Sequence, residues 1–271
     1  MELPIALAER TEIQAYADFV GGAPEAVRQQ LGIAVKRVGS ATALAIRGDS
    51  TRFLNRAGGF GGDTPVTADA VAEICDFYRE QGVTAASVLI APSELPADWV
   101  AIAAKLGLVE GATFVKLGYE VGRVLDAPAD GLRVELVDPT RAGEWAAVMM
   151  STYGMTDEGM VGMGAAAVGR PNWGNYAAFD GDRIIAIASL YVNGECGDMF
   201  GAATLPDARG RGAQSALLAA RAHAAAAEGC QWLVAETGAE QPGQHNSSLH
   251  NMLRAGFRPL YERTTWVWRV S

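Results

Sequence analysis

The sequence is poor in the residues that bind metals and form disulfides. Its 271 residues include only three cysteines and three histidines. These are Cys75, Cys196 and Cys230, and His223, His245 and His250. An odd, scattered set of cysteines indicates reduced core thiols, which are typical of a cytoplasmic protein. The histidines have no Cys or His partners at metal-binding spacing, so we expect no metal site.

The sequence also lacks long apolar runs and an excess of positive charge. No apolar run approaches the ~20 residues that a membrane span needs. Residues 1–4 lack the basic region and apolar core of a signal peptide. The formal net charge of −9 argues against general nucleic-acid binding and is compatible with an amine substrate. We therefore expect a monomer or homodimer with no membrane and no nucleic-acid partner.

Residues 199–229 contain the most informative local pattern. Strand-like residues Met199 to Leu205 run into Pro206, which suits the end of a strand because it has no N–H. Arg209-Gly210-Arg211-Gly212 follows, and then an Ala-rich run without a breaker until Gly229. Apolar residues recur in that run at helical spacing. The pattern predicts a strand, a glycine-containing loop and a helix.

This loop has the properties of an anion site. Free N–H groups and the helix dipole favour negative charge at a helix N-terminus. Gly210 and Gly212 let a ligand approach the backbone, and Arg209 and Arg211 can fork onto phosphate oxygens. The Lys-Ser/Thr of a nucleotide P-loop is absent, and Ser215 replaces the third glycine of the dinucleotide fingerprint. An ordinary turn with two solvated arginines is the alternative.

The length allows one large domain or two smaller ones. Residues 122–131 are the best linker candidate, which gives domains 1–125 and 126–271. The two halves share one order of elements. The elements of the first half are strand 52–56, helix 67–81, strand 86–91, helix 98–106 and strand 113–121. The corresponding elements of the second half are strand 199–205, helix 212–228, strand 232–236, helix 247–255 and strand 260–269. This order indicates a tandem duplication. An unrelated first domain is the alternative.

The loop and the helix after it resemble the acetyl-CoA loop of the GNAT acetyltransferases, Arg/Gln-x-x-Gly-x-Gly/Ala. Arg209 and Gly212 match this pattern, whereas Gln214 stands where the family prefers Gly or Ala. Residues 246–257 resemble that family's last helix and its Gly-Phe exit, and residues 132–271 follow its order of elements. The resemblance implies an α/β (α+β) fold of two tandem GNAT-like domains, the first degenerate. Each domain would be a mixed, mostly antiparallel twisted sheet flanked by helices.

The resemblance also implies the site. Acetyl-CoA, as co-substrate, would lie in a splay between the strand before the loop and the strand after the helix. Its contacts would come from Ala203, Thr204, Leu205, Arg209, Gly210, Arg211, Gly212, Ala213, Gln214, Ser215 and Asn246. The backbone N–H of Leu205 would polarise the thioester carbonyl. Asn246 suits a helix N-cap equally well.

The acceptor would be an amine on a small molecule or a peptide. Glu236 or Asp198 is the candidate base, provided that burial raises its pKa. Met252 occupies the position of the family's usual tyrosine acid, so Tyr261, Tyr191 or a water would replace it. Residues of the acceptor pocket would come from a mobile helix or lid at 157–168 and from Tyr153, Trp173 and the neighbouring methionines, which core packing explains equally well.

These residues together predict an acetyl-CoA-dependent N-acetyltransferase that works by direct attack of the amine. The second half would carry the activity, and the degenerate first half would shape the acceptor site. Gln214 and the missing tyrosine motivate the alternative, a non-catalytic acyl-CoA-binding or interaction module.

Overall fold

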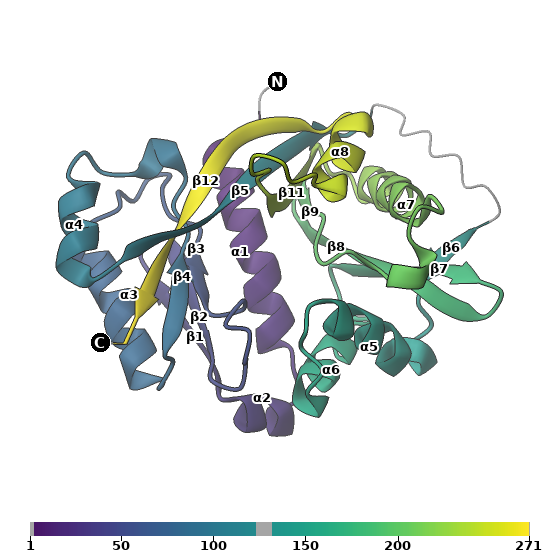
Figure 1. The fold of residues 1–271 in the computed structure, drawn as a ribbon, viewed down its shortest axis with the longest axis horizontal. Coiled ribbons are helices and arrows are strands. Elements are labelled where there is room, and N and C mark those ends of the chain that lie inside the picture. Colours follow the sequence, from purple (N-terminus) through teal and green to yellow (C-terminus); the bar gives the residue numbers. More distant parts are fainter. Residues whose placement is uncertain (1–2, 123–131, 271) are drawn as a thin grey trace.

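The computed structural model describes residues 3–122 and 132–270. Twelve strands form one continuous, mostly antiparallel sheet in the order β1-β2-β3-β4-β12-β5-β11-β9-β8-β7-β6, with β10 paired to β8 (Figure 1). The strands are β1 (Ile33–Val38), β2 (Ala41–Ile46), β3 (Arg56–Gly58), β4 (Ala85–Val88), β5 (Val109–Glu120), β6 (Arg133–Leu136), β7 (Trp173–Asp180), β8 (Arg183–Asn193), β9 (Cys196–Asp198), β10 (Ala203–Thr204), β11 (Trp232–Gly238) and β12 (Arg258–Arg269).

Helices cover both faces of the sheet. They are α1 (Ile5–Gly21), α2 (Glu25–Leu31), α3 (Ala68–Glu80), α4 (Trp99–Leu106), α5 (Ala142–Thr152), α6 (Glu158–Ala165), α7 (Ala213–Ala227) and α8 (Ser247–Arg254). Alternate residues of β2 show the layering: Leu44 packs in the core that contains α1 and α5, whereas Ala43 packs in the core that contains α3 and α4. Helices α7 and α8 pack together with β11 in a third core.

The two halves of the chain exchange their last strands. β5 of the first half pairs with β11, and β12 of the second half pairs with β4. The two exchanged strands also pair with each other along Arg258↔Gly118 to Val267↔Val109. They cross between the halves in Figure 1. The repeated order of elements is therefore present, but neither half completes its sheet with its own final strand. The predicted boundary between 125 and 126 lies outside the described residues and stays a prediction.

Three predicted elements differ from the structure. Residues 52–55 form turns because Asp49 accepts hydrogen bonds from the backbone N–H groups of Thr51 and Leu54, and the strand begins only at Arg56. The predicted strand at 199–205 is reduced to Ala203–Thr204, because the chain leaves the sheet between Asp198 and Ala203. The expected lid at 157–168 is the packed helix α6, in which Met160 and Met163 are buried against the first core.

Candidate active site

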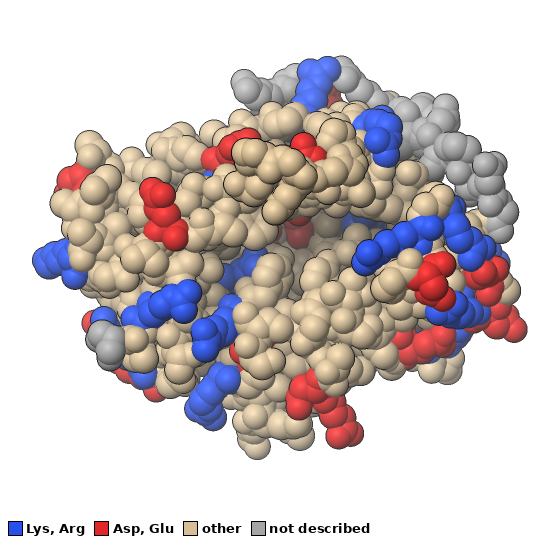
Figure 2. Space-filling view, viewed as in Figure 1, with Lys and Arg blue, Asp and Glu red and all other residues tan. Residues whose placement is uncertain are grey.

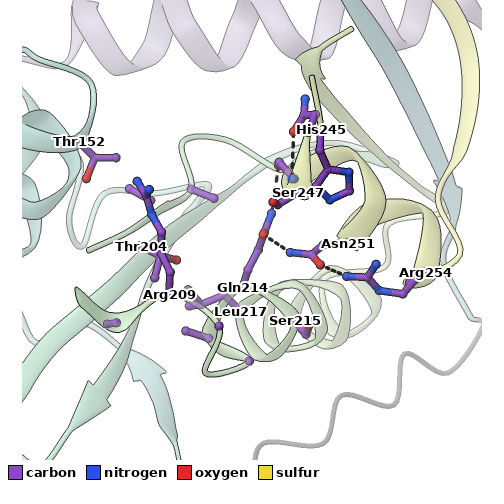
Figure 3. A pocket seen from close by; sticks show the side chains of 18 of the residues that line it. Thr152, Thr204, Arg209, Gln214, Ser215, Leu217, His245, Ser247, Asn251 and Arg254 are labelled. Atoms are coloured by element: carbon purple, nitrogen blue, oxygen red, sulfur yellow. Dashed lines mark hydrogen bonds between the residues drawn. The ribbon is translucent and has the colours of Figure 1, made fainter. Parts of the chain in front are cut away.

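A cleft opens where two neighbouring strands separate. β9 and β11 run parallel and pair as far as Asp198↔Val234, and the Met199 N–H still donates to the Val234 carbonyl at 2.8 Å. The chain then turns toward β8, with which β10 pairs. The resulting cleft has a volume of about 860 Å³. Its walls are β10, the start of α7 and the segment that leads into α8 (Figure 3).

The start of α7 presents unpaired amides to this cleft. Its N-cap is Gly212, and no side chain caps the helix. The first intrahelical bond is donated by Ala216, so the N–H groups of residues 213–215 have no acceptor within the helix. Gly210 and Gly212 adopt φ of +75° and +78°, a conformation that favours glycine. The junction therefore has the geometry of an anion site.

The two loop arginines differ in their surroundings. Arg209 lines the cleft and makes no ion pair with any described residue. The Arg211 guanidinium donates to Asp180 at 2.7 Å and does not line the cleft. The structure therefore places Arg209 at the cleft, whereas Asp180, the last residue of β7, holds Arg211 outside it. The contact between Arg211 and the ligand stays a prediction.

The predicted role of the Leu205 amide is also wrong. The Leu205 N–H donates to the Ile185 carbonyl of β8 at 2.9 Å and is not free to polarise a carbonyl. Bonded and non-bonded pairs alternate along an antiparallel ladder. The adjacent pair Thr204↔Ala186 is therefore the non-bonded one. It follows that the Thr204 N–H points away from β8, toward the cleft that Thr204 lines.

Gln214 neither fills the anion site nor points to solvent. Its side chain reaches from α7 to α8, where it donates to the Ser248 hydroxyl at 3.0 Å and accepts from Asn251 (Figure 3). Asn246 is the N-cap of α8, since its side-chain oxygen accepts from the N–H groups of residues 248 and 249. Its amide nitrogen donates to the Gly238 carbonyl at 2.6 Å and so ties β11 to the helix. Both side chains line the cleft.

A second cavity of about 330 Å³ adjoins the cleft. Ala202 and Ser248 line both spaces, so the two are in contact. Figure 2 shows the surface hollowed near the centre of this face, with acidic side chains at the floor of the hollow. Six aromatic residues surround the second cavity: Tyr16, Phe19, Phe53, Phe114, Tyr153 and Phe200. Three carboxylates also line it, from Glu12, Asp198 and Glu236. We call this space the acceptor cavity.

A buried network of charges lies behind the acceptor cavity, where α1 meets the exchanged strands. Lys116 of β5 contacts Glu12 at 2.5 Å and Glu236 at 3.3 Å. Arg263 of β12 contacts Glu9 at 2.5 Å and Glu12 at 2.8 Å, and also pairs with Glu236. Both cations are at most 1% exposed. The network therefore compensates carboxylates that would be very costly to bury alone.

The two candidate bases have different partners. Glu236 is held by Lys116 and Arg263, whereas the carboxylate of Asp198, 5% exposed, forms no ion pair in the described structure. Burial and the neighbouring Glu12 raise the pKa of Asp198 to about 8, although Lys116 and Arg221 act in the opposite direction. Burial and Glu12 also raise the pKa of Glu236. Asp198 is thus a buried, unpaired carboxylate that titrates near neutral pH.

The tyrosines expected to replace the missing acid are occupied elsewhere. Tyr261 donates its hydroxyl to Glu9 at 2.5 Å, and Tyr191 packs on Trp173 in the core, with ring centroids 5.0 Å apart. Neither lines the cleft or the acceptor cavity. Tyr153 does line the acceptor cavity, and its hydroxyl donates to the Ala202 carbonyl at 2.8 Å, where the two spaces meet. Met252 also lines this cavity.

The remaining acceptor-pocket residues divide between wall and core. Met149, Met150 and Met155 line the acceptor cavity, whereas Trp173 does not. The first half contributes Glu12, Tyr16 and Phe53 to this cavity, and no sequence pattern had indicated these three residues. Glu12 left one signal, since it is an acidic residue on the buried face of an apolar helix.

One group of described side chains has metal-ligand chemistry. Glu240, His245 and His250 place a potential ligand atom each within 4.8 Å of one another at the edge of the cleft. All three are at least partly exposed, and Glu240 already accepts hydrogen bonds from the Asn246 N–H and contacts His250 at 2.9 Å. The contacts of Glu240 with Asn246 and His250 join the two ends of the segment that leads into α8.

No helix in the described part of the chain is long and apolar enough to span a membrane.

Comparisons with known proteins identify a family model and a shared fold. Residues 147–257 match the sequence model of the Acetyltransferase (GNAT) family. A GCN5-related N-acetyltransferase from Kribbella flavida is similar in structure, with a TM-score of 0.61, 17% identity, and coverage of 91% of this chain and 94% of that one. A tandem GNAT protein from the clavulanic acid biosynthesis pathway gives a TM-score of 0.57 at 11% identity, with coverage of 96% of both chains.

A GCN5-related N-acetyltransferase from Sphaerobacter thermophilus gives a TM-score of 0.58 at 14% identity, over 98% of this chain and 94% of that one. A comparison with curated proteins finds no match. At these identities the solved structures establish the fold, and the family model adds the sequence match in the second half. Residues 147–257 therefore match the model of the Acetyltransferase (GNAT) family, and the whole chain shares the fold of solved GNAT proteins, one of which is a tandem GNAT protein.

Proposed function

We propose that this protein transfers an acetyl group from acetyl-CoA to a primary amine by direct attack of the amine. Members of the GNAT family use acyl-CoA to acylate amines. The observation that carries the proposal is the contact between two different spaces at Ala202 and Ser248. One space has free helix amides suited to phosphates, and the other has an unpaired carboxylate suited to an amine.

The cleft fits a ligand with a pyrophosphate and a long polar arm. Its volume of about 860 Å³ lies within the 300–1,000 Å³ that is usual for small-molecule sites. The amides of residues 213–215 and the side chain of Arg209 would hold the pyrophosphate. The arm would follow β10, and the Thr204 N–H would donate to the acyl carbonyl and stabilise the charge that develops on its oxygen.

Asp198 would accept the proton of the attacking amine. In its ionised form this carboxylate takes one proton from the amine nitrogen as the new N–C bond forms and the C–S bond of the thioester breaks. A pKa of about 8 suits this task near neutral pH, because the carboxylate is partly ionised and still basic. Glu236 would instead neutralise the buried cations Lys116 and Arg263.

Tyr153 would return a proton to the departing sulfur. Its hydroxyl lies at the junction of the two spaces, where it donates to the Ala202 carbonyl. Burial raises the pKa of this phenol above its usual value, so it stays protonated at neutral pH and can act as a donor. Tyr153 would therefore act as the general acid in place of the tyrosine that is absent from the last helix, where Met252 stands.

The test is a turnover assay with acetyl-CoA and a broad panel of primary amines, in which thiol release is followed. The proposal predicts turnover of at least one amine, and at least 100-fold slower turnover by Asp198→Asn. A matched control is Asp182→Asn, an exposed carboxylate of the β7–β8 turn that lines neither space. Tight binding of acetyl-CoA with no turnover of any amine would favour the non-catalytic acyl-CoA-binding module instead.

A further inference from the structure

The walls of the acceptor cavity carry one sign of charge. Among its described lining residues there is no Lys, Arg or His, while Glu12, Asp198 and Glu236 all contribute carboxylates. Three buried cations adjoin these carboxylates: Lys116 and Arg263 lie behind them in ion pairs, and Arg56 lies 4.0 Å from Glu12. These cations offset the charges of Glu12 and Glu236, which leaves Asp198 as the lining carboxylate without an ion pair. Arg221 also faces Asp198 electrostatically, but its guanidinium donates to the Ser189 carbonyl at 3.0 Å. The cavity therefore favours a cation and repels a carboxylate.

The rest of the wall is apolar and flat. Tyr16 packs edge-to-face on Phe200, with centroids 4.9 Å apart. Phe53 and Tyr153 stack with centroids 6.2 Å apart and planes inclined by 14°. The Arg56 guanidinium already covers one face of Tyr16 and one face of Phe53, at 4.0 and 4.3 Å from the ring centroids. The remaining ring surface binds flat apolar groups well. Such walls match an amine that carries an apolar body.

Size and hydrogen bonding exclude larger polar amines. The cavity volume of about 330 Å³ is at the lower end of the range for small-molecule sites. Three of the four hydroxyl groups among the described lining residues are already engaged: Tyr153 with Ala202, Ser248 with Gln214, and Thr237 with Asn246. Only the Tyr16 hydroxyl makes no hydrogen bond to another described residue. A hydroxyl-rich sugar would lose its hydration without gaining matching partners.

We propose, on the basis of the acetyl transfer proposed above, that the acceptor is a compact primary amine on an apolar, preferably aromatic, body with no carboxylate beside the amine. Asp198 binds its ammonium group, and the aromatic wall holds its body. Amino acids and aminoglycosides are excluded for two separate reasons, charge repulsion for the former and size and unmatched hydroxyl groups for the latter.

Matched substrates test this inference. 2-Phenylethylamine and L-phenylalanine differ only by the carboxylate, and kanamycin represents a large polar amine. At saturating acetyl-CoA, kcat/KM for 2-phenylethylamine should exceed that for each of the other two at least 100-fold. Phe53→Ala should raise the KM for 2-phenylethylamine at least fivefold and leave the Kd of acetyl-CoA within twofold, because Phe53 lines only the acceptor cavity. Phe53→Tyr, which keeps the ring, should restore the KM.

A parallel calorimetric titration of each amine into the protein saturated with CoA separates the two proposals. Binding of 2-phenylethylamine but not L-phenylalanine, without turnover, would support the ligand class and contradict the acetyl transfer. Turnover of L-phenylalanine or kanamycin at a rate equal to or above that of 2-phenylethylamine would overturn the ligand class and support the acetyl transfer. Neither binding nor turnover of any of the three would overturn the ligand class.

Discussion

The ring of Phe53 stacks on the ring of Tyr153, with centroids 6.2 Å apart and planes inclined by 14°. Phe53 comes from a turn in the first half of the chain, and Tyr153 follows α5 in the second half. Both rings line the acceptor cavity. The first half therefore supplies part of the site, although its own glycine-containing loop at 57–66 has no pair of arginines.

Tyr153→Phe separates the hydroxyl from the ring. The variant keeps the stack on Phe53 and loses only the donor at the junction of the two spaces, so kcat should fall about 10–100-fold, within the range of general acid catalysis. The KM for the amine should change less than threefold. Steady-state kinetics measure both values. Tyr191→Phe is the control, since Tyr191 lies in the core, and an equal loss of kcat in both variants would argue against Tyr153 as the proton donor.

The pKa of Asp198 sets the pH dependence of turnover. Only the ionised carboxylate accepts a proton, and burial and Glu12 raise its pKa to about 8. At saturating amine, log kcat should therefore rise with pH with a slope near 1 below about pH 8 and level off above it. The measurement is a kcat profile from pH 6 to 10. Asp198→Asn should lose this limb; an unchanged limb in the variant would assign the titration to another group.

The same group affects stability with the opposite sign. A carboxyl titrates near 3.9 when unfolded, so between about pH 4 and pH 8 the folded protein binds more protons at Asp198 than the unfolded chain does. Its contribution to stability therefore falls as pH rises through this window. Asp198→Asn should be more stable than the wild type at pH 8 by about 1 kcal/mol or more, which corresponds to a rise in Tm of about 2–4 °C. An equal Tm at pH 8 would contradict the raised pKa.

Arg263 joins the exchanged strand β12 to three carboxylates of the buried network. Arg263→Met leaves those largely buried carboxylates short of a cation, so the free energy of unfolding should fall by about 3–5 kcal/mol. Chemical denaturation measures the change. Arg258→Met, at an exposed position of the same strand, is the control and should stay within about 0.5 kcal/mol of the wild type. A similar small change for Arg263→Met would mean that the network is dispensable for stability.

Gln214 connects α7 to α8 by hydrogen bonds to Ser248 and Asn251. Gln214→Ala should cost about 1 kcal/mol of stability through the lost hydrogen bonds. The Kd of acetyl-CoA should change less than threefold, because we assign the pyrophosphate to backbone amides and Arg209 rather than to this side chain. Thermal unfolding and calorimetric titration of the variant measure the two effects. A tenfold or larger gain in affinity would show that the side chain crowds the ligand.

Local patterns predicted the cleft well. The glycines, the arginine pair and the Ala-rich helix all lie within residues 209–229, so the sequence alone indicates a helix N-terminus that presents free amides. The structure confirms the unpaired amides of residues 213–215 and the separation of the strands beside them. The N-cap role of Asn246 is equally local, because its acceptor contacts reach residues only two and three positions away.

Features that depend on distant contacts were not predictable in this way. The Leu205 amide is occupied by β8, and Arg211 is held by Asp180, a residue of the preceding hairpin. The exchange of β5 and β12 leaves no trace in a pattern that repeats identically in both halves. Pairing of Glu12 with Lys116 and Arg263 joins three elements far apart in the chain. Sequence spacing does not show which carboxylate of the acceptor cavity lacks an ion pair. In the structure that carboxylate is Asp198.

The most direct test of the central claim is a calorimetric titration of acetyl-CoA into three proteins: the wild type, Gly212→Glu and Gly212→Ala. Both variants strain the positive φ of Gly212, but only the glutamate places a negative charge at the start of α7, where it would repel the pyrophosphate. We predict that the wild type binds, that Gly212→Ala binds more weakly, and that Gly212→Glu loses at least 100-fold in affinity while remaining folded. A wild-type protein that does not bind acetyl-CoA, or equal affinities in all three, would contradict the assignment of the cleft.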